Sequence, residues 1–175
     1  WPSALPPLEE WVALAVANKP RPILPDAPPD VVAMVDASAY GWGFIAMDLT
    51  TGKTLFHTER WSDAFIARNG IEKLRRSTFT EPQALLRAKR ILAAAFGDHR
   101  RSFRVASDSV TAVAAHRKGY SSVSYDINFI CLIDRSDPEI KKHQWEYLHV
   151  AGTKNILADK LSRGDTLSFP SASTS

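Results

Sequence analysis

Strand-like and helix-like patterns succeed one another along residues 31–163 in an order that few folds can accommodate. Three strand-like runs come first, and helical patterns then alternate with two further strand-like runs. Tight turns make consecutive strands antiparallel, whereas a helical crossover makes the strands that it joins parallel. The order therefore predicts an α/β fold with a five-stranded mixed sheet, in which three antiparallel strands are followed by parallel additions and helices flank the sheet.

The predicted strands are apolar and β-branched runs that end at turn residues. They cover residues 31–35, 44–47, 54–61, 103–107 and 145–150. The clearest helical periodicity covers 84–96, and Pro82 is expected in the first turn of that helix, where a missing N–H is tolerated. Ser109 and Asn155 are predicted to cap the helices that follow the fourth and fifth strands. A further helix is predicted around 127–133.

Prolines divide the chain, because eight of the eleven lie within residues 1–29. Proline at that density interrupts helices and central strands. Residues 1–30 are therefore predicted to be a linker, with room for one or two helical turns at 8–17. Residues 31–164 are predicted to form the folded domain, and 165–175, rich in Ser and Thr, a flexible tail. Since the chain begins with Trp rather than Met, we expect it to be part of a longer protein.

Composition restricts the kinds of site that the chain can build. Its single cysteine, Cys131, excludes an internal disulfide, and no Cys/His set could close a zinc site, so any metal must be held by oxygen. Twenty-two Lys and Arg against nineteen Asp and Glu give a net charge of +3, which is compatible with a phosphate-bearing partner. No run of eighteen apolar residues is present, so we expect no membrane partner and an intracellular location, cytoplasmic or nuclear.

Four carboxylates stand where an α/β sheet commonly binds ligands. Asp36 and Asp108 directly follow two predicted strands, and if these strands are parallel neighbours, both residues lie at the same edge of the sheet. Glu81 lies at the start of the clearest helix, and Asp159 lies in the first or second turn of the last one. Each placement alone is also typical of an ordinary turn or cap residue, and only their joint position suggests one site.

A cluster of carboxylates is unfavourable without a cation, because like charges repel one another. Oxygen ligands favour Mg²⁺ or Mn²⁺ over zinc, and two such ions about 3.5–4 Å apart can activate a water and stabilise the leaving oxygen in phosphodiester cleavage. The residues therefore indicate phosphoryl-transfer chemistry on a nucleic acid. The remaining aspartates without a strand-end position are predicted to be caps or surface charges: Asp126, Asp134, Asp137 and Asp165. Four histidines are assigned to the surface or to packing: His57, His99, His116 and His143.

Four motifs in a fixed order resemble the ribonuclease H domain of retroelement reverse transcriptases. They are Val35-Asp36-Ala37-Ser38 with Gly41-Trp42-Gly43, then Thr80-Glu81-Pro82-Gln83-Ala84, then Ser107-Asp108-Ser109, and finally the run from His149 to Arg163, which includes Ala158-Asp159-Lys160-Leu161-Ser162-Arg163. The similarity covers about 31–164. It is greatest to retrotransposons, including the tyrosine-recombinase type such as the trypanosomatid element VIPER. Each motif alone is weak, but the ordered set is specific.

The resemblance implies a ribonuclease H-like fold and hydrolysis of the RNA strand of RNA–DNA hybrids during reverse transcription. The four carboxylates would then hold two Mg²⁺ or Mn²⁺ ions, and Asp36 would bridge both. His149, on the loop leading to the last helix, becomes a candidate for proton transfer or product release, although a histidine at a strand end is as often simply hydrogen-bonded or exposed. A polymerase domain in the same polypeptide, joined through residues 1–30, would help to hold the hybrid.

Six residues are predicted to contact the nucleic acid. They are Ser38, Gly41, Gly43, Arg75, Arg76 and Asn155. The two glycines could let the backbone approach RNA closely, although a simple turn between strands explains them equally well. The segment 62–80 is longer than is typical of the family, and its basic residues either contact phosphates or belong to a solvated loop. Pro82 also departs from the family, since a residue such as leucine is typical directly after the glutamate.

Two alternatives belong to other functional classes. The first is a catalytically inactive ribonuclease H-like module that binds nucleic acid or serves as a scaffold. Retention of all four carboxylates argues against it, because a scaffold does not need a repulsive cluster. The second is a proofreading-type exonuclease. That family is expected to carry an Asp-x-Glu motif on its first strand, whereas this chain has Asp36-Ala37-Ser38.

Overall fold

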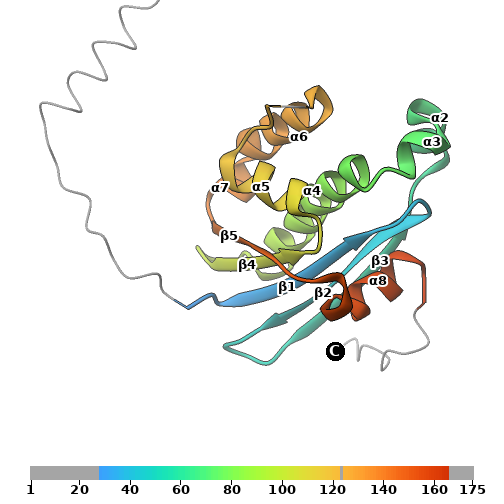
Figure 1. Ribbon diagram of the computed structural model, residues 1–175. Coiled ribbons are helices and arrows are strands. Elements are labelled where there is room, and N and C mark those ends of the chain that lie inside the picture. Colours follow the sequence, from blue (N-terminus) through green and yellow to red (C-terminus); the bar gives the residue numbers. More distant parts are fainter. Residues whose placement is uncertain (1–27, 123, 166–175) are drawn as a thin grey trace, which may run out of the picture.

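The computed structural model describes residues 28–122 and 124–165 (Figure 1). Its strands are β1 (Val31–Ala37), β2 (Gly41–Asp48), β3 (Thr54–Arg60), β4 (Ser102–Ser107) and β5 (Gln144–His149). Its helices are α2 (Asp63–Asn69), α3 (Ile71–Leu74), α4 (Ser77–Phe96), α5 (Val110–Lys118), α6 (Tyr125–Ser136), α7 (Pro138–Lys141) and α8 (Ile156–Ser162), with a 3₁₀ turn at Gly152–Lys154. The turns predicted at 8–17 and nearly all of the predicted linker and tail lie outside the described residues.

The five strands form one mixed sheet in the order β3-β2-β1-β4-β5. The pairs β1–β2 and β2–β3 are antiparallel, while β1–β4 and β4–β5 are parallel. The predicted sheet is therefore confirmed, both in its number of strands and in the change from antiparallel to parallel pairing. Because β1 and β4 are parallel neighbours, the chain leaves both strands at the same edge of the sheet.

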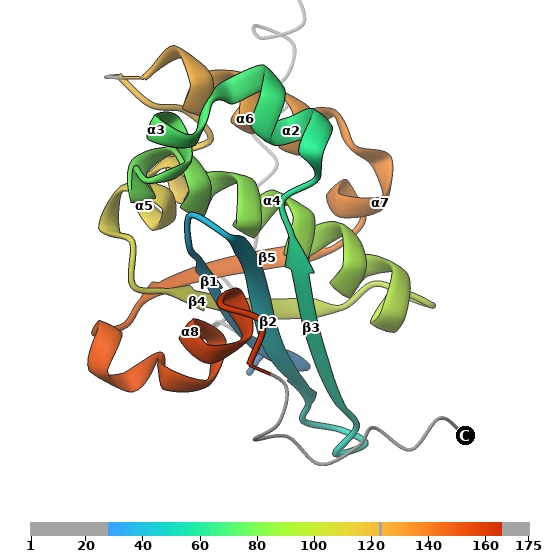
Figure 2. The same cartoon turned by 90° about the vertical axis from the view of Figure 1, so that its right-hand side faces the viewer.

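Helices cover both faces of the sheet, with α4 across one face and α8 against the other (Figures 1 and 2). Alternate residues of the central strands face α4 and are fully buried, among them Val35, Phe44 and Val105. Leu85 and Leu92 of α4 pack against them and are also fully buried. The opposite face is covered only in part, and beside α8 it has an apolar hollow of about 370 Å³. Burying the apolar side of each strand under α4 is the main stabilising contribution.

The segment 62–80 is helical, which corrects the prediction of a solvated loop. It forms α2, α3 and the first turn of α4. The Ser62 hydroxyl caps α2 by accepting a hydrogen bond from the backbone amide of Phe65, and the Phe65 ring stacks on Phe79 with 6.1 Å between ring centroids. This contact buries Phe79, and α4 begins at Ser77, earlier than the helix start that the sequence predicts. Pro82 consequently lies inside the helix, not in its first turn.

Two aspartates predicted to be caps or surface charges differ in their surroundings. Asp137 does cap α7, accepting hydrogen bonds from the amides of Glu139 and Ile140. Asp134, by contrast, is buried and paired with Lys89, so its prediction was wrong. The sequence could not reveal this pair because its members lie 45 positions apart on two helices.

Ser109 caps α5 as predicted, with its hydroxyl accepting a hydrogen bond from the amide of Ala112. His116 and His143 are buried, which fits their assignment to packing. Throughout 28–122 and 124–165, no helix combines the length and the apolar character needed to cross a membrane.

Candidate active site

Three carboxylates from three elements meet at the edge of the sheet where β1 and β4 end. Asp36 lies near the end of β1, Asp108 directly follows β4, and Glu81 is carried over this edge by α4. One oxygen atom of each carboxylate lies within 4.8 Å of an oxygen of the other two. The structure thus brings together three of the four carboxylates that the sequence singled out.

Glu81 is held rigidly by two hydrogen bonds. Its Oε1 accepts from the backbone amide of Ala37 at 2.9 Å, and its Oε2 accepts from the Ser107 hydroxyl at 3.1 Å. Only 2% of Glu81 is exposed. Despite Pro82 directly after it, the side chain is oriented by the ends of both central strands, so the departure from the family pattern does not turn it away from the site.

The electrostatics of the cluster favour a cation. Burial, together with the neighbouring charges of Asp36 and Asp108, raises the pKa of Glu81 to about 8. Burial also raises the pKa of Asp36 to about 6, and the carboxylates of Asp108 and Asp159 add to the effect. A bound divalent ion would relieve both the lost hydration and the repulsion. The donor set consists entirely of oxygen, which suits Mg²⁺ or Mn²⁺.

Asp159 lies near this cluster but is not one of the three closely grouped carboxylates. It is in the first turn of α8, and its Oδ1 accepts hydrogen bonds from Arg163 Nε at 3.0 Å and Nη2 at 2.8 Å. Its charge nevertheless contributes to the raised pKa of Asp36. The fourth predicted carboxylate therefore lies at the rim of the site, paired with an arginine.

Asn155 is fully buried beside Asp36. Its side-chain amide donates to the Val35 carbonyl at 3.1 Å and to Asp36 Oδ1 at 3.4 Å. It occupies the predicted N-cap position of α8 but makes no side-chain capping bond there, and its contact with nucleic acid stays a prediction that its full burial does not support. Its Oδ1 has no hydrogen-bond partner among the described residues. The residue instead helps to hold the end of β1 and the Asp36 side chain.

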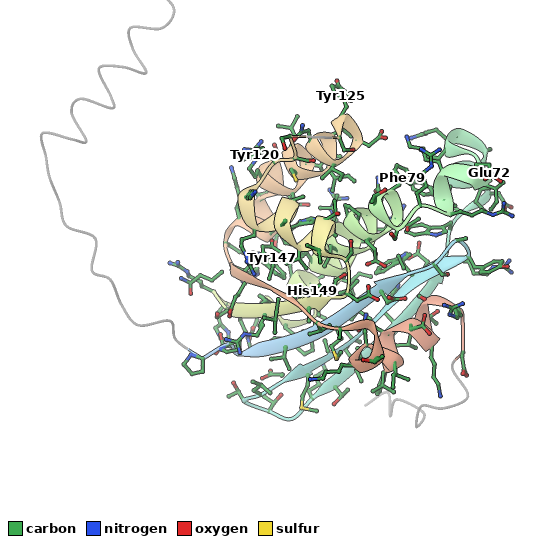
Figure 3. All side chains as sticks on the ribbon, viewed as in Figure 1. Glu72, Phe79, Tyr120, Tyr125, Tyr147 and His149 are labelled. Carbon is green, nitrogen blue, oxygen red and sulfur yellow. The ribbon has the colours of Figure 1, made fainter. Side chains whose placement is uncertain are left out.

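His149 stands at the end of β5 (Figure 3), and its ring contacts the backbone of Asp108. Its Nε2 lies 3.1 Å from the carbonyl oxygen of Asp108 and therefore donates a hydrogen bond to it, which leaves Nδ1 as the acceptor in the neutral ring. The side chain is exposed, as a residue that exchanges protons with a substrate must be. Its functional role stays a prediction.

Packing shapes the turn at Ser38 and the start of β2, where Gly41 and Gly43 lie. The Ser38 hydroxyl donates to the carbonyl of Ser162 at 2.8 Å, which ties the turn to α8. A Cβ atom at Gly41 would lie 2.3 Å from the backbone oxygen of Glu59, and one at Gly43 would lie 2.6 Å from Leu161 Cβ. The space left by the missing side chains is thus filled by the protein itself. Contact between this turn and RNA remains a prediction.

Arg75 and Arg76 lie at the junction of α3 and α4, and both are exposed. Arg75 pairs with Glu72 across 2.7 Å, but both side chains are more than half exposed, so this pair is weak. The structure therefore leaves both arginines accessible to a phosphate backbone. Their contact with nucleic acid is likewise still a prediction.

Sequence reasoning missed three residues that support the cluster. Ser107 holds Glu81, Ser162 lowers the pKa of Asp36 through a side-chain hydrogen bond, and Gly152 passes beside Asp108. A Cβ atom at Gly152 would lie 3.0 Å from Asp108 Oδ2, so a larger residue would crowd that carboxylate. All three belong to the motifs that carried the resemblance, which was the available signal.

No family model matches the sequence, and no curated protein is similar enough to match it. Solved structures do match. LC11-RNase H1, isolated from compost by a metagenomic approach, is 18% identical with a TM-score of 0.55, covering 79% of this chain and 96% of that chain. The N-terminal RNase H domain of Rv2228c from Mycobacterium tuberculosis is 14% identical with a TM-score of 0.58, covering 77% and 96%. The chain has a ribonuclease H-like fold.

RNase H1 from Halobacterium salinarum NRC-1 shares this ribonuclease H-like fold at 16% identity, with a TM-score of 0.53 and coverage of 77% of this chain and 96% of that chain. At such identities the likeness concerns the fold, which confirms the predicted fold class. The carboxylate cluster lies where β1 and β4 of the ribonuclease H-like fold end side by side.

Proposed function

We propose that this domain is a metal-dependent endoribonuclease of the ribonuclease H type, which hydrolyses the RNA strand of RNA–DNA hybrids. The observation that carries the proposal is the meeting of Asp36, Glu81 and Asp108 within 4.8 Å at one edge of the sheet. Two buried carboxylates, Asp36 and Glu81, with a third beside them destabilise a protein unless they bind a cation or a proton. Carboxylates whose pKa values are perturbed in this way are typical of functional sites.

Asp36, Glu81 and Asp108 would hold the divalent ions, with Asp159 at the rim. The proposed ions are two Mg²⁺ or Mn²⁺. When bound, they would lower the pKa of a water and stabilise charge on phosphate oxygens. The hydrogen bonds from Ala37 and Ser107 keep Glu81 oriented toward this position. His149 would take up or release a proton at Nδ1, since Nε2 is engaged by the Asp108 carbonyl.

We also propose that the domain acts in a retroelement reverse transcriptase, next to a polymerase domain in the same polypeptide. The support is the ordered set of motifs, whose residues are most similar to those of retrotransposons. The likeness to the VIPER-type elements belongs to this proposal and rests on the sequence alone. In the intact protein the polymerase domain would share the task of holding the hybrid.

A second candidate function is a catalytically inactive module that binds nucleic acid or serves as a scaffold. One observation favours it: Asp159 pairs with Arg163 instead of joining the other three carboxylates. If this ion pair persists in the presence of Mg²⁺, the site lacks its fourth acidic group. Cleavage and binding assays separate the two functions.

The deciding experiment is cleavage of a labelled RNA–DNA hybrid with Mg²⁺, Mn²⁺ or EDTA, beside single-stranded RNA, duplex RNA and duplex DNA. We expect metal-dependent cleavage of the hybrid's RNA strand and no detectable cleavage by Asp36→Asn. Asp98→Asn is the matched control, because Asp98 is exposed and pairs with its neighbours His99 and Arg101. Persisting activity in Asp36→Asn would refute the site, binding without cleavage would support the inactive module, and cleavage of duplex DNA would indicate another nuclease.

The proposed hybrid contact at 62–80 has its own test. Charge reversal at Arg75 and Arg76 should weaken hybrid binding and reduce the salt slope of log K by about 1 for each phosphate that the protein no longer neutralises. Arg90→Glu is the control. Arg90 is equally basic, but it lies farther along α4 and pairs with Asp137. Unchanged affinity and slope in the double variant would assign this segment to a purely structural role.

A further inference from the structure

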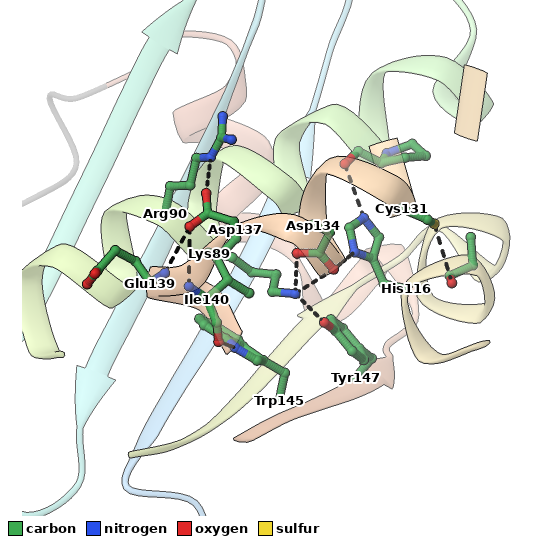
Figure 4. Close-up of polar contacts among 12 residues, drawn as sticks. Lys89, Arg90, His116, Cys131, Asp134, Asp137, Glu139, Ile140, Trp145 and Tyr147 are labelled. Carbon is green, nitrogen blue, oxygen red and sulfur yellow. Dashed lines mark hydrogen bonds and ion pairs between the residues drawn. The ribbon is translucent and has the colours of Figure 1, made fainter. Parts of the chain in front are cut away.

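A second polar cluster lies inside the domain, among α4, α5, α6 and β5 (Figure 4). Lys89 of α4 is 2% exposed, and its Nζ donates to both carboxylate oxygens of Asp134, at 2.5 and 2.7 Å, and to the Tyr147 hydroxyl at 2.6 Å. Asp134 and Tyr147 are each 7% exposed. Buried charges of this kind cost hydration and are directional, so they define geometry more than they add stability.

His116 of α5 extends this cluster toward the carboxylate site. Its Nδ1 lies 3.3 Å from Asp134 Oδ2, and its Nε2 lies 3.2 Å from the carbonyl oxygen of Pro82. A carbonyl oxygen can only accept, so Nε2 donates to Pro82. Lys89 from α4 shares the Asp134 Oδ2 atom with His116, and the Tyr147 ring from β5 lies beside the His116 ring, with 5.6 Å between ring centroids.

Pro82 is the residue directly after Glu81, at a weak point of α4. Proline lacks the N–H that would bond to the Thr78 carbonyl, and its ring disfavours helical geometry at the residue before it, which is Glu81. The hydrogen bond from His116 reaches α4 at this point. It comes from α5, the helix that begins two residues after Asp108. His116 therefore links the helix that carries Glu81 to the helix that follows Asp108.

We propose that His116 is a positioning residue for Glu81: by donating to the Pro82 carbonyl, it holds α4 against α5 and so sets the Glu81 carboxylate relative to Asp108. Apolar contacts between two helices tolerate small shifts, whereas a hydrogen bond from one ring nitrogen to one carbonyl depends steeply on distance and angle. A displacement of about 1 Å in a catalytic group can lower a rate about 100-fold. The kinetic consequence, though not the structural one, rests on the proposed function.

Three variants separate positioning from general packing. His116→Asn places its amide near the former Nδ1, which keeps the hydrogen bond with Asp134 and removes the one with Pro82. His116→Gln carries its amide out toward the former Nε2 and restores a donor to Pro82. His143→Asn is the matched control, because His143 is as buried as His116, at 6% against 5%, and accepts a hydrogen bond from the Arg101 amide instead.

The first readout needs neither metal nor activity. The Ala37 amide donates to Glu81 Oε1, so its proton chemical shift reports where the carboxylate lies. We expect the Ala37 signal to move upfield in His116→Asn and to stay near its original position in His116→Gln and His143→Asn. An unmoved Ala37 signal in folded His116→Asn overturns the proposal. If that variant does not fold, the ring nitrogens of His116 in the unmodified protein decide, since an Nε2 that carries no proton also overturns the proposal.

The second readout is steady-state cleavage of the hybrid. We expect His116→Asn to lower kcat about 10- to 100-fold with KM within about twofold, and His116→Gln to recover most of the loss. An Ala37 shift without loss of kcat refutes the catalytic consequence. If the unmodified protein cleaves no hybrid while the Ala37 signal still responds, the proposed function fails and the positioning role stands. If cleavage occurs and neither readout responds, the positioning role fails and the proposed function stands.

Discussion

Glu81 is an ionisable group whose burial should make the stability of the metal-free protein depend on pH. Glu81→Gln removes the charge but preserves the shape and both hydrogen bonds, since the amide oxygen can accept from Ala37 and the amide nitrogen can donate to Ser107. The variant therefore isolates the electrostatic cost of the carboxylate. We expect Glu81→Gln to be more stable than the unmodified protein at alkaline pH and equally stable in acid.

The magnitude follows from the raised pKa of Glu81, which is about 8 in the folded protein against 4.5 ordinarily. Below pH 4.5 the group is protonated in both states, so it costs nothing. Between pH 4.5 and 8 the unfolded chain releases this proton while the folded protein retains it, and each pH unit removes about 1.4 kcal/mol from the free energy of unfolding. At pH 8.5 we expect a difference of about 3–5 kcal/mol between Glu81→Gln and the unmodified protein.

Urea denaturation in EDTA at pH 4.5 and pH 8.5, followed by circular dichroism, measures this difference directly. Glu146→Gln is the control, because Glu146 forms an exposed ion pair with Arg104 and should change stability by less than about 1 kcal/mol at either pH. Added Mg²⁺ at 100 times its dissociation constant should restore about 2.7 kcal/mol to the unmodified protein at pH 8.5. Equal stability of Glu81→Gln and the unmodified protein at pH 8.5 would refute the reasoning.

Three further outcomes are expected. Gly43→Ala should lower the free energy of unfolding by about 1–3 kcal/mol, because the new methyl group would lie 2.6 Å from Leu161 Cβ; an unchanged denaturation midpoint would contradict this packing. Lys89→Met should cost about 3–5 kcal/mol by leaving Asp134 buried without its ammonium partner, and the double variant with Asp134→Leu should recover part of that loss in the same denaturation assay. Asp159→Asn should raise the Mn²⁺ concentration needed for cleavage about 10- to 100-fold, whereas an unchanged metal titration would place Asp159 outside the site.

Local patterns were enough to predict the sheet and the approximate place of the site. The apolar runs of β1 and β4 are typical of central strands, and the long crossover between these strands makes them parallel. Once that is known, Asp36 and Asp108 must lie at the same edge, which is why the cluster could be expected before any coordinates. These inferences depend on neighbouring residues, whose mutual geometry the backbone itself dictates.

Polar contacts between distant segments required the tertiary structure. Asn155 reaches Asp36 across 119 positions, and Lys89 reaches Asp134 across 45, so no local pattern distinguishes either from a cap or a surface charge. The early start of α4 has the same origin, because it depends on Phe79 packing against Phe65.

The sequence alone therefore establishes the order of the elements and the sheet edge at which the carboxylates gather. Turn lengths and apolar periodicity are local signals that can be recognised within a few neighbouring residues. Which carboxylates share the centre, and what holds each of them, is decided by packing among helices and strands. Asp159 shows the difference: its place in the last helix and its pairing with Arg163 four residues later follow from helical periodicity, but its position outside the close group of Asp36, Glu81 and Asp108 depends on how α8 lies against the sheet.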